Sequence, residues 1–225
     1  MTVELDFWVV LKEWPLLLTG VVWTLGLTFV SACVGIFSGL GLAWVRTQNW
    51  PMVSRMINIY VELIRNTPFI VQLFFIFFGL PQLGFRFSAE TSSVLAMVIN
   101  LSAYSTEIIR SGVEATPSGQ IQAGKSLGFT EFQVFKHVIL PPALFRVWPA
   151  LVAQIIIVML GSAVCGQIST EELSYSANLI QSRNFRAFEA FIVAAAIYLC
   201  LAIVIRWCLN RLGKNLIFKG LSQNG

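Results

Sequence analysis

The chain has 225 residues, of which 56% are hydrophobic and only 12% are charged, and its formal net charge is +4. A soluble domain carries about 25% charged residues, so half of that share cannot cover a soluble surface. The composition therefore excludes a soluble globular protein and predicts an all-α polytopic membrane protein. The basic excess calls for no nucleic acid as a partner, because basic residues beside membrane spans are a topology signal and attract lipid headgroups.

Long runs without charged residues locate the membrane spans. A helix needs about 20 mostly apolar residues to cross the hydrocarbon core, and these runs lack the alternation of barrel strands. About five spans are expected, at about 14–45, 56–80, 90–112, 143–170 and 187–210. The transmembrane domain then covers 14–212, between an N-terminal periplasmic or interfacial segment, 1–13, and a cytoplasmic tail, 213–225.

The basic residues of the short loops predict the orientation. They gather after the first span, after the third span and at the C-terminal end, whereas the opposite loops are mainly acidic. Cytoplasmic loops carry the excess of lysine and arginine. The N-terminus is therefore expected outside and the C-terminus in the cytoplasm, together with the polar loop at about 114–141.

The cysteines and the single histidine, His137, give no support to a metal site. The four cysteines lie in or beside apolar runs and no two form a C-x-x-C pair; they are Cys33, Cys165, Cys200 and Cys208. We predict that they are buried small hydrophobic side chains. Neither a metal ion, nor a resident cofactor, nor a catalytic residue is expected in this chain.

Two pairs of opposite charges lie at the ends of predicted spans. Glu62 precedes Arg65 by three residues, and Glu107 precedes Arg110 by the same distance. Residues three apart share a helix face, and charges in a membrane normally pair or face a wet cavity. We predict intramembrane pairs with a structural role near the inner interface. The alternative is that they line the substrate path or contact a neighbouring subunit.

Glycines four residues apart mark the first span. Gly35 and Gly39, followed by Gly41, would let helix backbones approach closely in lipid. We predict that they pack against another helix of the same chain; a contact with another subunit is the alternative.

The polar cytoplasmic loop predicts two short helices separated by a tight turn. The first begins after Pro117, with Ser118 as its cap, and ends at Gly128 in a left-handed conformation. The second begins at Thr130, which can form a capping box with Gln133. The following Pro-Pro pair is expected to stop the second helix before the next span.

The first short helix has a face of small and apolar residues. Ile121, Gly124 and Leu127 lie on one side, with Ala123 and Gly128 beside them. Such a face suits a groove on a partner protein. The alternative is that it packs under the helix bundle of its own chain.

Residues 119–126 also fit the phosphate-binding consensus G-x-x-x-x-G-K-[ST] of ATPases. That site needs a strand before the loop and a longer helix after it, and an acidic residue to help hold magnesium. The preceding segment is neither apolar nor β-branched, Gly128 breaks the following helix, and the only aspartate is Asp6. A P-loop ATPase is therefore rejected.

The spacing from Gln122-Ala123-Gly124 to Gly128, and on to Val138-Ile-Leu-Pro141, resembles the EAA loop of binding-protein-dependent ABC importers. Residues 61–81 and 103–110 are similar to the second and third spans of the polar amino acid permeases, the histidine, glutamine and arginine type. The resemblance covers about 19–212. It implies an ATPase-coupling role for Gly119, Gln120, Gln122, Ala123, Gly124, Leu127, Gly128, Leu140 and Pro141.

The resemblance also implies the partners. A type I importer transmembrane domain of about five helices pairs with a second permease, an ABC ATPase dimer that binds ATP and magnesium, and a periplasmic solute-binding protein. The substrate would be a polar amino acid, the location the bacterial inner membrane, and the chain itself no enzyme. A stand-alone secondary transporter or channel is the rival class, but no clear internal repeat supports it.

This chain departs from the family pattern at three places. Gln122 replaces the glutamate and Gly124 an alanine of the EAA motif, and Leu160-Gly-Ser-Ala-Val164 replaces the usual K-D-T-S-L. A charge-assisted hydrogen bond is about twice as strong as a neutral one, so the loss of the glutamate would weaken docking. We therefore expect a second, non-identical permease that keeps the charged forms.

Polar groups inside the spans are candidates for the substrate path, because intramembrane polar residues often mark pathways, although they also bond neighbouring helices. The candidates are Gln72, Asn100, Tyr104, Gln154, Ser162 and Gln167.

Overall fold

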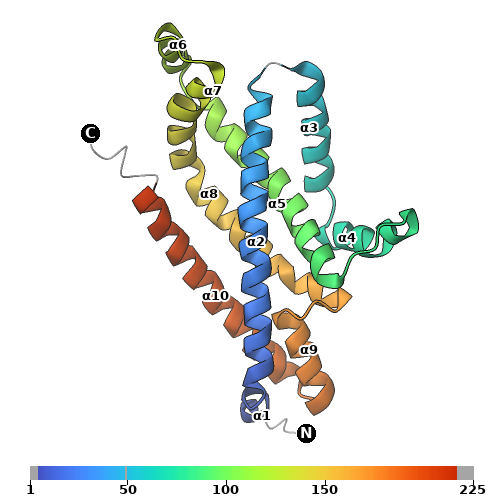
Figure 1. Ribbon diagram of the computed structural model, residues 1–225. Helices are drawn as coiled ribbons and strands as arrows, with labels where there is room; N and C mark the ends of the chain where they lie inside the picture. Colours follow the sequence, from blue (N-terminus) through green and yellow to red (C-terminus); the bar gives the residue numbers. More distant parts are fainter. Residues whose placement is uncertain (1–4, 49, 217–225) are drawn as a thin grey trace. The chain divides into compact units, whose positions relative to one another are not determined.

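The computed structural model describes residues 5–48 and 50–216, and within them it contains helices and no strand (Figure 1). Four helices are long: α2 (Trp14–Arg46), α5 (Ala89–Glu114), α8 (Leu140–Gly161) and α10 (Ala187–Leu216). The shorter α-helices are α1 (Phe7–Leu11), α3 (Pro51–Arg65), α4 (Phe69–Phe74), α6 (Ser118–Ser126), α7 (Glu131–Val134) and α9 (Leu173–Asn184). Two π-helical turns, η1 (Phe75–Gly79) and η3 (Phe135–Ile139), and two 3-10 turns, η2 (Leu80–Leu83) and η4 (Ser162–Ile168), extend them. The all-α prediction is confirmed.

Four helices in the described part are long and apolar enough to cross a membrane, or five if α3 and the stretch Phe69–Leu83 form one interrupted span. The helix in the region of the span predicted at 56–80 is interrupted, since it stops at Arg65 and restarts at Phe69. Pro68 explains the interruption, because proline disfavours helix at the residue before it and lacks a backbone donor. A hydropathy profile alone does not show this interruption of the helix.

The predicted terminal segments, 1–13 and 213–225, reach partly beyond the described residues. At the C-terminal end α10 continues to Leu216, so the first residues of the predicted tail are helical. At the N-terminal end the short helix α1 begins at Phe7, where the carboxylate of Asp6 accepts a bond from the Trp8 amide at 3.0 Å.

The chain divides into two compact units. Unit 1 comprises Met1–Ala32, Pro68–Val98 and Ile156–Ile205; unit 2 comprises Cys33–Thr67, Ile99–Ile155 and Arg206–Gly225. The long helices α2, α5, α8 and α10 contribute residues to both units.

The core of unit 1 joins α9 to α1, α2 and α10. Its buried side chains are Val10, Leu17, Leu173, Ala177, Ile180, Ala190 and Ala194. Gly20 permits the close approach of α2 and α9, because a Cβ atom there would lie 2.7 Å from Leu173 Cα. Any larger residue at position 20 would push the two backbones apart.

Unit 2 holds the predicted glycine contact. A Cβ atom at Gly35 would lie 2.9 Å from Leu101 Cβ, and one at Gly39 would lie 2.6 Å from Ser105 Cβ. These two glycines therefore pack α2 against α5 of the same chain, as predicted. Gly41 meets nothing within 4 Å and takes no part in this contact.

The predicted stop at the Pro-Pro pair is wrong, because α7, η3 and α8 follow one another without a break. Pro141 and Pro142 lie in the first turn of α8, directly after the π-helical turn. There the Leu140 amide donates to Phe135 O, five residues back. A π turn is wider than an α turn, so it accommodates prolines that cannot donate i→i−4 bonds.

The prediction that all four cysteines are buried is also wrong. Cys165 is buried and Cys33 is half-buried, but Cys200 and Cys208 are exposed on the surface of the chain. Both lie on α10, a helix whose apolar surface suits contact with lipid, so a small hydrophobic side chain can face outward there.

Candidate coupling loop and charge cluster

The polar loop between α5 and α8 folds as helix, turn and helix within unit 2. Gly128 has a φ of 81°, the left-handed conformation predicted for it. Thr130 and Gln133 form both bonds of the predicted capping box at the start of α7. Lys125 Nζ lies 2.7 Å from Glu131 Oε1 and joins α6 to α7 across the turn.

The prediction that Ser118 caps α6 is wrong. Ser118 is the first helical residue, and Pro117 occupies the cap position without a side-chain bond. Pro117 has a φ of −59°, an angle that its ring fixes. The chain therefore begins α6 without a capping side chain. Its carbonyl accepts the Gln120 amide at 3.1 Å.

One face of α6 packs against its own chain. Gly124 is buried, and a Cβ atom there would lie 3.3 Å from Val138 Cγ2 and 3.5 Å from Val134 Cγ2. Ile121 packs on the same hydrophobic cluster. Leu127, predicted on this face, is instead 76% exposed. This face therefore packs against the helix bundle of its own chain, which was the alternative to a groove on a partner protein.

The opposite side of α6 is open. The exposed residues away from the Gly124 face include Gly119, Gln122, Ala123 and Ser126. This side, and not the Gly124 face, is available to a partner.

The ATPase hypothesis fails on the same geometry. Residues 119–126 lie inside the short helix α6, so their backbone does not form a phosphate-cradling loop. No strand occurs in residues 5–48 and 50–216 to carry such a loop.

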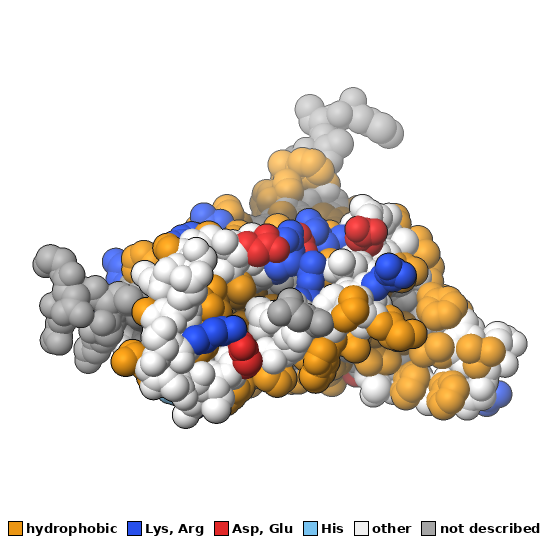
Figure 2. All heavy atoms as spheres, turned by 90° about the horizontal axis from the view of Figure 1, so that it is seen from above, with side chains coloured by type: hydrophobic (Ala, Val, Ile, Leu, Met, Phe, Trp, Pro, Cys, Tyr) orange, Lys and Arg blue, Asp and Glu red, His pale blue; other side chains and the backbone are white. Residues whose placement is uncertain are grey.

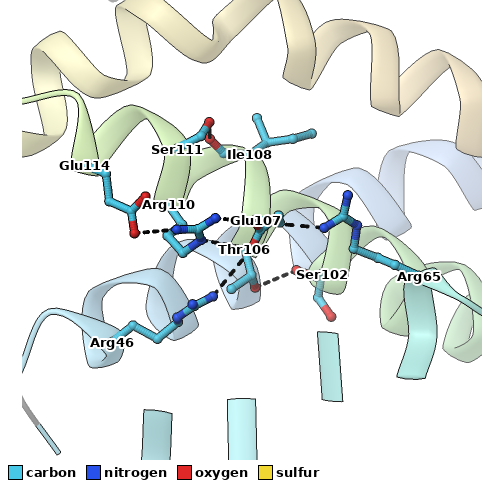
Figure 3. Close-up of polar contacts among 9 residues, drawn as sticks. All are labelled: Arg46, Arg65, Ser102, Thr106, Glu107, Ile108, Arg110, Ser111 and Glu114. Carbon is cyan, nitrogen blue, oxygen red and sulfur yellow. Dashed lines mark hydrogen bonds and ion pairs between the residues drawn. The ribbon is translucent and has the colours of Figure 1, made fainter. Parts of the chain in front are cut away.

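A cluster of charges surrounds Glu107 in unit 2 (Figure 3). Its carboxylate accepts from Arg110 Nε at 3.0 Å. Arg46 Nη1 lies 3.5 Å and Arg65 Nη1 lies 3.9 Å from it. Arg110 also pairs with Glu114. The cluster thus joins α2, α3 and α5, and the predicted Glu107–Arg110 pair is present.

The predicted pair between Glu62 and Arg65 is wrong. No ion pair joins them in the described part of the chain. Arg65 turns instead toward Glu107 and stacks on Tyr104, with its guanidinium carbon 5.4 Å from the ring centroid. Helical spacing places two side chains on one face, but a third charge on another helix can attract one of them more strongly.

From the end that carries α6 and α7, acidic and basic side chains lie beside one another amid apolar surface (Figure 2).

The six candidates for the substrate path fall into both units. Gln72 and Ser162 of unit 1, and Asn100 and Gln154 of unit 2, are buried. Tyr104 is half-buried and Gln167 is exposed. Ser162 Oγ donates to Met159 O at 2.6 Å, so its hydroxyl is used within its own helix.

Glu172, in unit 1, is the polar residue that sequence analysis missed. It is fully buried and caps α9, accepting the Ser174 amide at 3.0 Å and the Tyr175 amide at 2.8 Å. The hydroxyl of Tyr198 donates to the same carboxylate. A glutamate directly before a helix start was the available signal, because the N-terminus of a helix favours negative charge.

The comparisons with known proteins agree with this architecture. Residues 34–217 match the family described as binding-protein-dependent transport system inner membrane component. The nopaline transport system permease protein NocM of Agrobacterium fabrum (strain C58 / ATCC 33970) is 30% identical over 92% of each chain. The glutamine transport system permease protein GlnP of Escherichia coli (strain K12) is 33% identical, over 90% of this chain and 93% of that protein.

A solved structure, described as an amino acid ABC transporter with histidines, has 36% sequence identity and a TM-score of 0.85. The similarity covers 95% of this chain and 100% of that chain. Fold and sequence together define a helical, membrane-spanning permease subunit of an ABC transporter. The chain belongs to the family of inner membrane components of binding-protein-dependent transport systems.

Proposed function

We propose that the chain is the permease subunit of an ATP-driven importer of polar amino acids and that it couples to partner ATPases through α6. The names of its relatives, which transport glutamine and nopaline, support this substrate class. The chain is not an enzyme in this proposal. A partner ABC ATPase dimer binds ATP and magnesium and hydrolyses the ATP.

The two-sided packing of α6 carries the proposal. Its inner face rests on Val134 and Val138, directly before α8, while Gln122 and Ala123 lie on its open side. Gly124 permits this close contact, and the Lys125–Glu131 pair limits motion at the turn. A displacement imposed on the open side therefore passes to the beginning of a membrane helix, as a coupling element requires.

The remaining arrangement follows from the charge distribution and the family. The N-terminus lies outside and the C-terminus in the cytoplasm of a bacterial inner membrane, and a periplasmic binding protein delivers the amino acid. A second, non-identical permease retains the charges that are absent here at Gln122 and at residues 160–164. The path uses the polar groups Gln72, Asn100, Tyr104, Gln154, Ser162 and Gln167.

Transport proceeds by alternating access in this proposal. ATP binding closes the ATPase dimer, α6 moves with it, and the bundle opens toward the loaded binding protein. Hydrolysis returns the bundle to the inward-open state. Differential contacts of the ATPase in its two states supply the driving force for the change.

A glutamate on the open side of α6 tests the proposal. Ala123→Glu adds charge and bulk to the surface that faces the ATPase, whereas Ala115→Glu makes the same change at an exposed position before α6. The complete transporter is reconstituted in proteoliposomes and its ATP-dependent uptake of a labelled amino-acid panel is measured. We expect Ala123→Glu to reduce uptake about tenfold or more, the effect of a coupling change of about 1.4 kcal/mol. Ala115→Glu should transport normally.

Thermal stability and the amount of co-purified ATPase are measured for both variants. Equal stability combined with less bound ATPase in Ala123→Glu locates the defect at docking. Normal uptake in Ala123→Glu would remove the proposed role of α6. Uptake by the permease without any ATPase would instead support a secondary transporter.

A further inference from the structure

A cavity of about 270 Å³ opens beside the charge cluster in unit 2. Arg46, Arg65 and Arg110 line it together with the carboxylate of Glu107 (Figure 3). Small-molecule pockets range from about 300 to 1,000 Å³, so this cavity lies just below that range and suits only a small ligand.

The basic wall of the cavity is incompletely neutralised. Three guanidinium groups share the Glu107 carboxylate, and Arg110 binds it most closely, through Nη2 at 2.5 Å and Nε at 3.0 Å. Arg46 and Arg65 remain at 3.5 and 3.9 Å, whereas a close charge-assisted bond measures about 2.7–2.9 Å. Because each guanidinium has five N–H donors, Arg46 and Arg65 keep donors for an incoming carboxylate.

Acceptors lie on the same cavity wall. Glu62 and Asn58 line the cavity from α3, four residues apart and therefore on one helix face. Glu62 takes part in no ion pair within the described residues. A carboxylate and an amide oxygen accept hydrogen bonds from an ammonium group. The cavity thus offers donors for an anion and acceptors for a cation.

We propose that this cavity binds the zwitterionic backbone of an α-amino acid. The carboxylate of the ligand binds Arg46 and Arg65, and its ammonium group binds Glu62 and Asn58. This inference rests on the proposed function, which makes amino acids the cargo. A phosphate or a lipid headgroup phosphate would meet the same arginines but would be repelled by Glu62. Since the site contacts only groups that all α-amino acids share, it does not select the side chain.

Thiol protection at the cavity tests the site independently of transport. Asn58→Cys is introduced into a chain whose four native cysteines are alanine, which retains Glu62 as the charged acceptor. The complete transporter is placed in nanodiscs of neutral lipid, and the rate of thiol modification is measured. L-Glutamine and L-alanine should both slow the reaction. L-Glutaminamide, which lacks the carboxylate, and N-acetyl-L-glutamine, which lacks the ammonium group, should not.

Charge variants then identify the contacts. Arg65→Gln should raise the half-protecting concentration of L-glutamine about tenfold or more, because a charge-assisted hydrogen bond is lost. Arg55→Gln removes the same charge from an exposed position of α3 outside the cavity. This control should change the concentration less than about twofold.

Each contrary result has a distinct meaning. Protection by inorganic phosphate alone, or only in nanodiscs that contain anionic lipid, would overturn the zwitterion in favour of an oxyanion. Absence of protection in a transporter that takes up polar amino acids would overturn this site and leave the proposed function intact. Absence of uptake for every polar amino acid would overturn the proposed function, and the site with it.

Discussion

Two glutamates, one in each unit, are stabilised in opposite ways. Glu172 of unit 1 has no exposed surface and accepts from neutral groups, the amides of Ser174 and Tyr175 and the hydroxyl of Tyr198. Glu107 of unit 2 has a side chain that is 25% exposed and is surrounded by three guanidinium groups. The first carboxylate is enclosed by its donors, whereas the second has more donors than it can bind closely.

This difference indicates which region can rearrange. A buried group that loses a neutral donor has no water to replace it, so the bonds of Glu172 form and break together with the packing of α9. The arginines around Glu107 border a cavity and can exchange one carboxylate for another at small cost. Glu172 therefore suits a permanent structural role, and Glu107 suits a part of the protein that moves or binds a ligand.

Removal of the buried acceptor should have the largest effect. Glu172→Ala leaves two amides and the Tyr198 hydroxyl without their acceptor, and each unsatisfied group costs about 1–3 kcal/mol. At about 2–4 °C per kcal/mol for a chain of this size, we expect the melting temperature of the detergent-solubilised complex to fall by about 5–10 °C or more.

Glu171→Ala is the matched control, because the neighbouring glutamate is exposed. Its melting temperature should stay within about 1 °C of the wild type, since most surface substitutions change stability by less than 0.5 kcal/mol. Equal effects at positions 171 and 172 would show that the hydrogen bonds of Glu172 do not stabilise unit 1.

Neutralisation of the half-buried carboxylate of Glu107 should have a smaller effect that depends on salt. Glu107→Gln leaves Arg46, Arg65 and Arg110 near one another without their shared anion, so their repulsion should lower the melting temperature by about 2–5 °C. Salt screens partly exposed charges. Raising the NaCl concentration from about 0.05 to 0.5 M should therefore reduce this loss in Glu107→Gln and leave the loss in Glu172→Ala unchanged. A salt-independent defect in both variants would remove the distinction between the two glutamates.

The parts of the fold that depend on local chemistry could be predicted from sequence. Charge-free runs locate the helices because the hydrocarbon core excludes charge, and the turn at Gly128 and the capping box of Thr130 depend on residues within four positions. The errors occur where two local rules compete. Pro68 interrupts an apolar run, and a π-helical turn lets the chain pass Pro141 and Pro142 without a break.

The polar sites depend on contacts between distant residues. Arg46 lies 61 positions before Glu107, so no spacing rule could join them. Tyr198 is 26 positions after Glu172, and only the packing of α9 with α10 shows that this glutamate is buried. The Glu107–Arg110 pair was predictable because both residues share one helix. The same rule failed for Glu62 and Arg65, since Glu107 competes for the arginine.

The smallest effects should separate the arginines of the cluster from one another. Arg110 binds Glu107 through Nε and Nη2, whereas Arg46 approaches it with Nη1 alone, at 3.5 Å. Lysine keeps the charge but cannot form the two-pronged contact. Arg110→Lys should therefore lower the melting temperature by about 2–3 °C, the equivalent of roughly 1 kcal/mol. Arg46→Lys should change it by less than about 1 °C, because a single long contact is worth little at a partly exposed site.

A larger loss in Arg46→Lys would show that Arg46, and not Arg110, is the main partner of Glu107. The arginine that can exchange Glu107 for another carboxylate would then be Arg110 on α5, and not the arginines on α2 and α3.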